Sequence, residues 1–163
     1  MTPAQQSALE GVVGRGLTPL EVEQISGHIA AGRRDDLIAA VLSSGRTKLV
    51  PRMVSSRGLA ALMPGGPLAA EDVLLKLEGA RDALLASQDA GQRLMGSLLR
   101  RQLGFLAGEG LDFGAAALQG MLDQFAAQEI LTESEATALK AMGVAPDPVA
   151  VSQVSDALNA VEG

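Results

Sequence analysis

The side chains that could carry out chemistry are few and lie far apart in the sequence. His28 is the only histidine and the chain has no cysteine, which excludes a thiol nucleophile, a disulfide and a cysteine-bound zinc. A metal site needs three or four ligands at set spacing, and the helical turns beside this histidine offer only Glu21, Glu23 and Gln24. We therefore expect a structural histidine, with no metal and no cofactor.

Acidic pairs are a second candidate, because two carboxyl groups can divide the work of a general acid and a general base. The pairs are Asp35 with Asp36, Glu71 with Asp72, and Glu133 with Glu135. Each lies where a helix is expected to begin, and negative charge there opposes the positive end of the helix dipole. A nucleophilic serine also needs a base and an orienting partner, which one histidine does not supply. We expect no enzyme and no small-molecule substrate.

The most informative candidate for binding is the basic stretch formed by Arg46, Lys48, Arg52 and Arg57. Residues 37–70 contain no acid, so the local charge is +4 in a chain whose net charge is −6. The basic stretch could bind an acidic surface of a partner protein or the phosphates of a nucleic acid. It has no aromatic residue on which a base could stack. The interpretation that we favour is a solvated loop whose basic side chains pair with acids of this chain.

Charge and apolar content restrict the partners. Residues 102–163 carry nine acids and one lysine, and the backbone of DNA repels an acidic protein, so nucleic acid is not the expected partner. No apolar run reaches the roughly 18 residues of a membrane span, and the N-terminus lacks the features of a signal peptide. The apolar residues exceed what one helical bundle buries, which indicates an interface with a protein partner or a homo-oligomer.

The elements that would position these residues are helices. The clearest signals are two Leu-Thr-x-x-Glu segments, at 17–21 and 131–135, which are typical of a capping box at a helix start. Thr2-Pro3 predicts another start, whereas 47–50 is expected to be extended. A helix after that is expected to begin at Pro51 or only at Ser55.

A helical hairpin at about 92–107 and 113–129 is expected to form the centre of the fold. Its first helix has Leu94, Leu98 and other leucines over one half of its circumference, which predicts a core-facing amphipathic helix. Asp112 is expected to cap the second helix. The hairpin contains all three phenylalanines of the chain, which we assign to the core: Phe105, Phe113 and Phe125.

These signals predict an all-α fold, a compact bundle of about seven to eight short helices around the hairpin. With 163 residues, a single domain over 1–163 is expected. Pro64-Gly65-Gly66-Pro67 is considered as a sub-boundary at 64–67, and 144–163 is expected to form a C-terminal helical appendage. Gly79 is considered as a division within the helix that follows Pro67.

Segments near the end of the chain suggest a family. LTESEATALKAMG at 131–143, VAPDPVAVSQVSDALN at 144–159 and SGRTKL at 44–49 resemble segments of small uncharacterised all-helical proteins from the late, virion-related gene modules of tailed phages. The resemblance implies a tail, baseplate or fibre-associated role, or an accessory one, in the virion or the host cytoplasm. It offers no catalytic residues.

Three hypotheses follow. The first is a non-enzymatic structural or protein-interaction protein, as a component of a phage particle. The alternative is a small acidic regulator or inhibitor that binds a host protein, with the acidic region 102–163 in a basic nucleic-acid groove. The third is a nucleic-acid-binding helical domain that uses the basic stretch.

Overall fold

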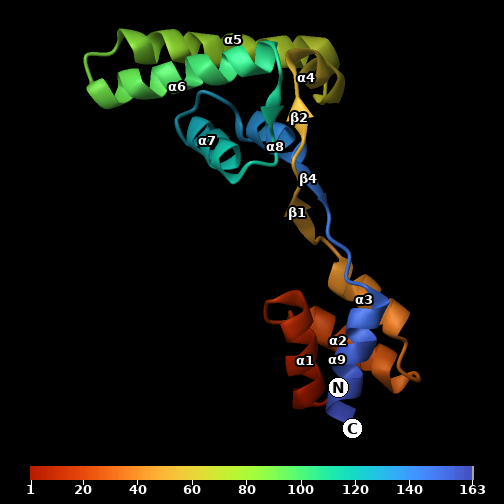
Figure 1. The fold of residues 1–163 in the computed structure, drawn as a ribbon. Helices are drawn as coiled ribbons and strands as arrows, with labels where there is room; N and C mark the ends of the chain where they lie inside the picture. The colour runs from red at the N-terminus through yellow and green to blue at the C-terminus, as the bar shows by residue number, and fades with distance from the viewer. Residues whose placement is uncertain (163) are drawn as a thin grey trace. The chain divides into compact units, whose positions relative to one another are not determined.

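The structure, a computed structural model, describes residues 1–162 and confirms the all-α class (Figure 1). These residues form nine helices and four strands of two or three residues. The helices are α1 (Pro3–Val13), α2 (Pro19–Ala30), α3 (Asp35–Ser43), α4 (Ser56–Leu62), α5 (Gly66–Ala86), α6 (Ala90–Ala107), α7 (Ala116–Ala127), α8 (Glu133–Ala141) and α9 (Val151–Glu162). The strands are β1 (Thr47–Leu49), β2 (Met53–Val54), β3 (Leu111–Asp112) and β4 (Val144–Pro146).

The chain folds into two compact units, where the sequence predicted one domain. The first unit contains residues 1–48 and the chain from Pro146 onward, and the second contains Leu49–Ala145. Each unit has its own buried apolar core. The segment 64–67, considered as a sub-boundary, lies inside the second unit, where it includes the first residues of α5. The apolar spacing of a helix predicts its buried face but not the helix that covers it, so the division into two cores was not visible in the sequence.

The first unit is built from both ends of the chain. Helix α9 packs beside α1 and α3, and α2 packs beside α3 (Figure 1). The expected appendage 144–163 therefore supplies a central helix of this unit. An ion pair of 2.6 Å between Arg33 Nη1 and Glu162 Oε2 holds α9 at its far end. The core residues are Leu9, Val13, Ile25, Ile38, Ala39, Leu42, Val149, Val154 and Leu158.

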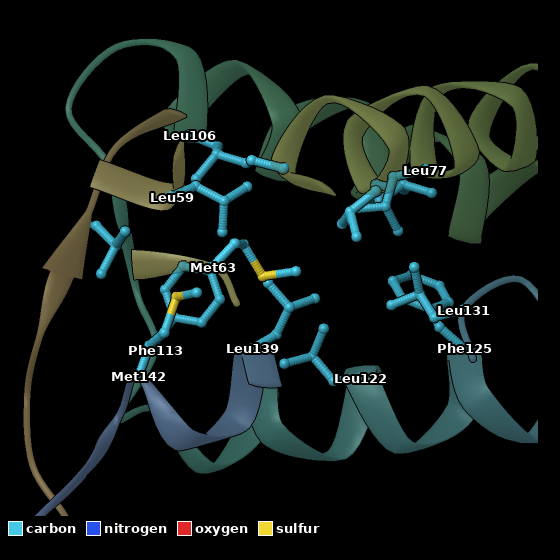
Figure 2. Packing of buried hydrophobic residues seen from close by; sticks show 14 residues of the cluster. Leu59, Met63, Leu77, Leu106, Phe113, Leu122, Phe125, Leu131, Leu139 and Met142 are labelled. Atoms are coloured by element: carbon cyan, nitrogen blue, oxygen red, sulfur yellow. The ribbon is translucent and has the colours of Figure 1, made fainter. Parts of the chain in front are cut away.

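The second unit has two layers of helices. Helices α5 and α6 lie side by side and α4 packs against α5, whereas α7 packs with α8 (Figure 1). Figure 2 shows the core between the layers, with Leu59, Leu77 and Leu106 facing Leu122 and Leu139. The two layers therefore bury their apolar faces against each other in one core.

The two helices expected to form a central hairpin, α6 and α7, are both present but belong to different layers. Helix α6 packs along α5, and a Cβ added to Gly96 would lie 2.9 Å from the backbone nitrogen of Leu85. Helix α5 runs without a break through Gly79. Phe113 and Phe125 are buried as predicted, but Phe105 is 44% exposed, which corrects its assignment to the core.

Strands and tight backbone crossings join these helices. β1 pairs with β4, and β2 pairs with β3 in antiparallel register, with Val54 opposite Leu111. β1 confirms the extended chain predicted at 47–50. A Cβ on Gly143 would overlap the carbonyl group of Phe113, so this crossing requires glycine.

Asp112 does not cap a helix. Its Oδ1 accepts hydrogen bonds from the backbone nitrogens of Arg52, at 2.8 Å, and Gly114, at 3.0 Å. Helix α7 begins later, at Ala116, without a side-chain cap. No helix within residues 1–162 has both the length and the apolar character that a membrane crossing requires.

Candidate interaction surface

An open groove of about 490 Å³ runs between α6 and α7 in the second unit. It exists because each of these helices packs most closely with another helix of its own layer. One wall, from α6, presents Met95, Leu98 and Gln102. The floor and the other wall, from β3 and α7, are lined by Leu111, Asp112, Ala115, Ala116, Ala117, Leu118, Gly120, Met121 and Gln124. We call this the α6/α7 groove.

Small residues keep the α7 wall low. Ala116, Ala117 and Gly120 are exposed, and a Cβ added to Gly120 would meet no atom within 4 Å. This glycine, which the sequence suggested as a point of close helix packing, therefore has no close neighbour in the described part of the chain. A wall of small side chains leaves the backbone of α7 accessible to an apolar group.

Exposed apolar side chains form the rim of the groove on α6. Leu94, Leu98 and Phe105 follow one another at intervals of four and seven residues, so they lie in one stripe along the helix. Leu94 is 73% exposed. Single exposed apolar residues are common on soluble proteins, but a contiguous apolar patch indicates an interaction site.

Helix α6 also carries positive charge, and Arg101 is the cation nearest to this stripe. Residues 90–107 contain three arginines and no acid. Arg93 Nη1 donates to the carbonyl oxygens of Ser87 and Gln88, at 3.1 and 2.7 Å. Arg100 and Arg101 are exposed and make no ion pair with any residue in 1–162.

Two acids, Asp112 on the groove floor and Asp123 on another face of α7, are already engaged. Asp123 on α7 makes a 2.6 Å ion pair with Lys140 on α8. Asp112 accepts the two backbone hydrogen bonds described above. The cation nearest to the rim of the groove is therefore Arg101, three residues after Leu98 and four before Phe105, whereas the one charged residue that lines the groove is Asp112.

The basic stretch predicted as a binding site is divided between the two units. Arg46 in the first unit makes a 2.8 Å ion pair with Asp147 and donates to the carbonyl oxygen of Val13 at 3.0 Å. Lys48 lies 3.5 Å from the same Asp147 carboxylate. The hydrogen bond from Arg46 holds the pKa of the Asp147 carboxyl below its ordinary value, against the opposing effect of desolvation. These two side chains pair with an acid of the chain, as in the solvated-loop interpretation.

The other two members of the basic stretch belong to the second unit. Arg52 Nη1 donates to the carbonyl oxygen of Met142 at 3.4 Å. Arg57 lies on α4 and is exposed. Neither unit carries all four basic side chains on its own surface.

The residues considered for catalysis have ordinary structural surroundings. His28 lies in the last turn of α2 and is half-buried, beside a shallow hollow that Leu20, Glu23 and Gln24 also line. Within residues 1–162, His, Asp and Glu side chains form no group of three that could hold a metal ion.

Two of the acidic pairs lie in the first turn of a helix as expected, in α3 and in α8. The third differs. Because α5 begins at Gly66, Glu71 and Asp72 lie beyond its first turn, on an exposed face. The helix dipole therefore does not account for this pair.

Sequence reasoning did not identify the α6/α7 groove or its rim. Leu94, Leu98 and Phe105 were counted among core residues because they continue the apolar face of α6. One available signal was the width of that face, half of the helix circumference, which exceeds the roughly 100° that one packing partner covers. Comparison of the chain with protein-family models, curated proteins and solved structures finds no match.

Proposed function

We propose that this chain is a non-enzymatic protein-interaction protein that binds its partner through the α6/α7 groove, and that it acts as a component of a tailed-phage particle. The observation that carries the interaction is the groove of about 490 Å³ continued by the exposed stripe Leu94, Leu98 and Phe105. An apolar groove beside a helix fits an apolar helical face of another protein. The resemblance of 131–159 to tailed-phage proteins supports the role as a particle component. It also supports a location in the virion or the host cytoplasm.

The two alternatives have less support from the geometry. The acidic region 102–163 is divided between the units at Ala145, and four of its acids already form ion pairs: Asp123, Glu135, Asp147 and Glu162. A regulator that presents this region as one acidic surface is therefore less well supported. The nucleic-acid hypothesis relies on the basic stretch, but two of its members, Arg46 and Lys48, are paired with Asp147.

A groove-filling variant tests the proposal. Gly120→Arg places a long side chain at the groove, and the open space around Gly120 tolerates it. Replacing a helical glycine also removes a residue of low helix propensity, so the fold is retained. Gly11→Arg in α1 is the matched control, because Gly11 is also helical, exposed and without a neighbour within 4 Å of an added Cβ.

The measurement is the amount of each chain, quantified by mass spectrometry, in purified particles of the phage that encodes it. We expect the unaltered chain and Gly11→Arg to be present at equal levels and Gly120→Arg to be depleted at least about tenfold. Equal incorporation of all three would contradict the role of the groove. Absence of the unaltered chain from the particles would contradict the particle role.

A further inference from the structure

A small apolar cavity lies directly behind part of the α6/α7 groove. Its volume is about 30 Å³, and Figure 2 shows several of its lining side chains in the core between the two layers. Four half-buried residues line both the cavity and the groove, and we call them the gate: Gln102, Leu111, Leu118 and Met121. Met121 has an unbranched, flexible side chain, so it can move aside to admit a group from the groove.

The size and the lining of the cavity restrict what can enter it. About 10–15 Å³ holds one water molecule, whereas a cavity that binds benzene measures about 150 Å³. The cavity of about 30 Å³ therefore has room for the methyl groups at the tip of an aliphatic chain but not for an aromatic ring. Gln102 is the one polar residue among those that line it, and a buried water needs at least about two polar partners. The cavity is suited to an aliphatic group and not to water.

Two polar groups at the gate and beside it have hydrogen-bonding capacity that the chain does not use. Oδ1 of Asp112 accepts the two backbone hydrogen bonds described above, but Oδ2 accepts none from residues 1–162. The side-chain amide of Gln102 makes no hydrogen bond within the same residues. A polar group that is covered without a new partner loses its hydrogen bonds to water. The occupant of the groove must therefore supply partners for both groups.

Charge also selects the occupant. Asp112 is the one charged residue that lines the groove, and it makes no ion pair with any residue in 1–162. The helical repeat places Arg101 about 100° around α6 from Gln102, on the far side of the stripe of Leu94, Leu98 and Phe105. The carboxylate of Asp112 therefore attracts a cationic occupant and repels an anionic one.

We propose that the α6/α7 groove binds a basic, aliphatic segment of the partner protein. An aliphatic side chain of this segment passes the gate into the cavity, and a lysine or arginine pairs with Oδ2 of Asp112. The inference rests on the proposed function and gives the chemistry of the partner at that same site. Asp112 directly follows Leu111 of the gate, so the two anchoring side chains lie within about one helical turn of each other. The amide of Gln102 bonds the backbone of the same segment.

Probes with one alkyl chain and different head groups test the charge preference without the partner protein. At neutral pH hexylamine is a cation, hexanol is neutral and hexanoate is an anion. Each is titrated into isotope-labelled full-length protein and followed by NMR. We expect the methyl signals of Leu111, Leu118 and Met121 to shift, and hexylammonium to bind at least about threefold more tightly than hexanoate at low salt.

A charge-neutral variant assigns this preference to one residue. Asp112→Asn removes the charge but keeps a side-chain oxygen that can accept the hydrogen bonds from Arg52 and Gly114. It should bind hexylammonium and hexanoate about equally. Asp123→Asn is the control, because it changes the net charge by the same amount on a face of α7 outside the groove, and it should keep the preference. Circular dichroism checks that both variants retain their helices.

The shape of the probe tests the cavity. The unaltered chain should bind hexylammonium at least about threefold more tightly than phenethylammonium, whose ring the cavity cannot admit. Leu118→Ala enlarges the gate and the cavity, so this variant should lose the preference for the alkyl chain. Leu94→Ala truncates a leucine of α6 that lines neither the groove nor the cavity, and it should retain the preference.

The segment that occupies the groove can be identified in purified particles. A photo-activated cross-linking amino acid at Ala117, which is exposed in the groove, should join one segment of one partner protein, identified by mass spectrometry. We expect that segment to contain a lysine or arginine within about one helical turn of a leucine, isoleucine or valine. Incorporation of Asp112→Asn should be at least about threefold below that of Asp123→Asn.

Several results would overturn the basic occupant. They are probes that leave the gate signals unchanged, probes that bind equally whatever their head group, and a cross-linked segment that is acidic. If Gly120→Arg is lost from particles but Asp112→Asn is retained, the groove is the interface and only the basic occupant is wrong. If neither variant is lost, the proposed function is wrong as well, and a preference for hexylammonium would then assign the groove to a free cationic amphiphile.

Discussion

The sequence Leu-Thr-x-x-Glu occurs once in each unit and begins a helix in both. In the first unit, the backbone nitrogen of Thr18 donates to Glu21 at 2.7 Å, and that of Glu21 donates to Thr18 Oγ1 at 3.3 Å. In the second unit, the corresponding distances for Thr132 and Glu135 are 2.8 and 3.2 Å. The two capping boxes are the same local structure.

Their surroundings are different. Glu21 is bound by Arg15 at 2.6 Å, from six residues earlier in the chain. Glu135 is bound at the same distance by Lys76 of α5, 59 residues earlier. Local chemistry therefore sets where these helices begin, whereas the rest of the unit decides whether the motif also joins distant elements.

The leucines that precede the two threonines also differ. Leu131 is only 1% exposed and belongs to the core between the two layers (Figure 2). Leu17 is partly buried at the edge of the first core. Equivalent positions in one motif thus contribute differently to stability.

Truncation of these leucines should give the largest difference between the two capping boxes, measured as the loss in free energy of unfolding. Leu131→Ala leaves a cavity in the core and should lower the free energy of unfolding by about 2–5 kcal/mol. Leu17→Ala removes half-buried surface and should lower it by about 1 kcal/mol or less. Urea denaturation of the full chain, followed by circular dichroism, measures both. Equal losses would show that the two motifs are equivalent in packing as well as in capping.

Removal of the cap itself should affect the boxes equally. Thr18→Ala and Thr132→Ala each remove one side-chain acceptor at a helix start, which costs about 1 kcal/mol. Thr→Ser at the same positions keeps the hydroxyl and serves as the control. If Thr132→Ala costs much more than Thr18→Ala, the cap in the second unit also supports the link between Glu135 and Lys76.

The helix starts could be predicted because their chemistry is local. Thr2, Thr18 and Thr132 bind backbone groups within the next three residues, so sequence spacing alone identifies them. The sequence left open whether the helix after 47–50 begins at Pro51 or only at Ser55. In the structure, Ser55 caps α4 in the same way as these threonines. Asp112 failed as a cap because its carboxylate is occupied by the backbone nitrogen of Arg52, 60 residues away.

The candidate surface could not be predicted from periodicity. Leu94, Leu98 and Phe105 continue the apolar face of α6, and the pattern reports only that the face is apolar. Whether it is covered depends on where α7 lies, and α7 packs in the other layer with α8. The same limit explains the two cores, because α9 and α1 meet only through folding of the whole first unit.

The smallest difference between the two capping boxes should be in the titration of their glutamates, Glu21 and Glu135. The hydrogen bond from Arg15 is the main cause that lowers the pKa of the Glu21 carboxyl to about 2. For Glu135, desolvation raises the pKa, but the hydrogen bonds from Lys76 and Thr132 outweigh it and the net shift is downward. NMR titration of the carboxyl carbons should therefore place both glutamates below their ordinary pKa of 4.5.

The sign of the pH dependence follows from these shifts. Because both folded-state pKa values lie below those of the unfolded chain, each box stabilises the protein fully above the unfolded pKa, and that stability is lost as the pH falls through the folded pKa. For Glu21 the window runs from about 4.5 down to about 2. Arg15→Gln should raise the pKa of Glu21 and leave that of Glu135 unchanged, and Lys76→Gln should do the reverse. A variant that moves both would mean that the boxes are coupled, against the assignment of each to its own unit.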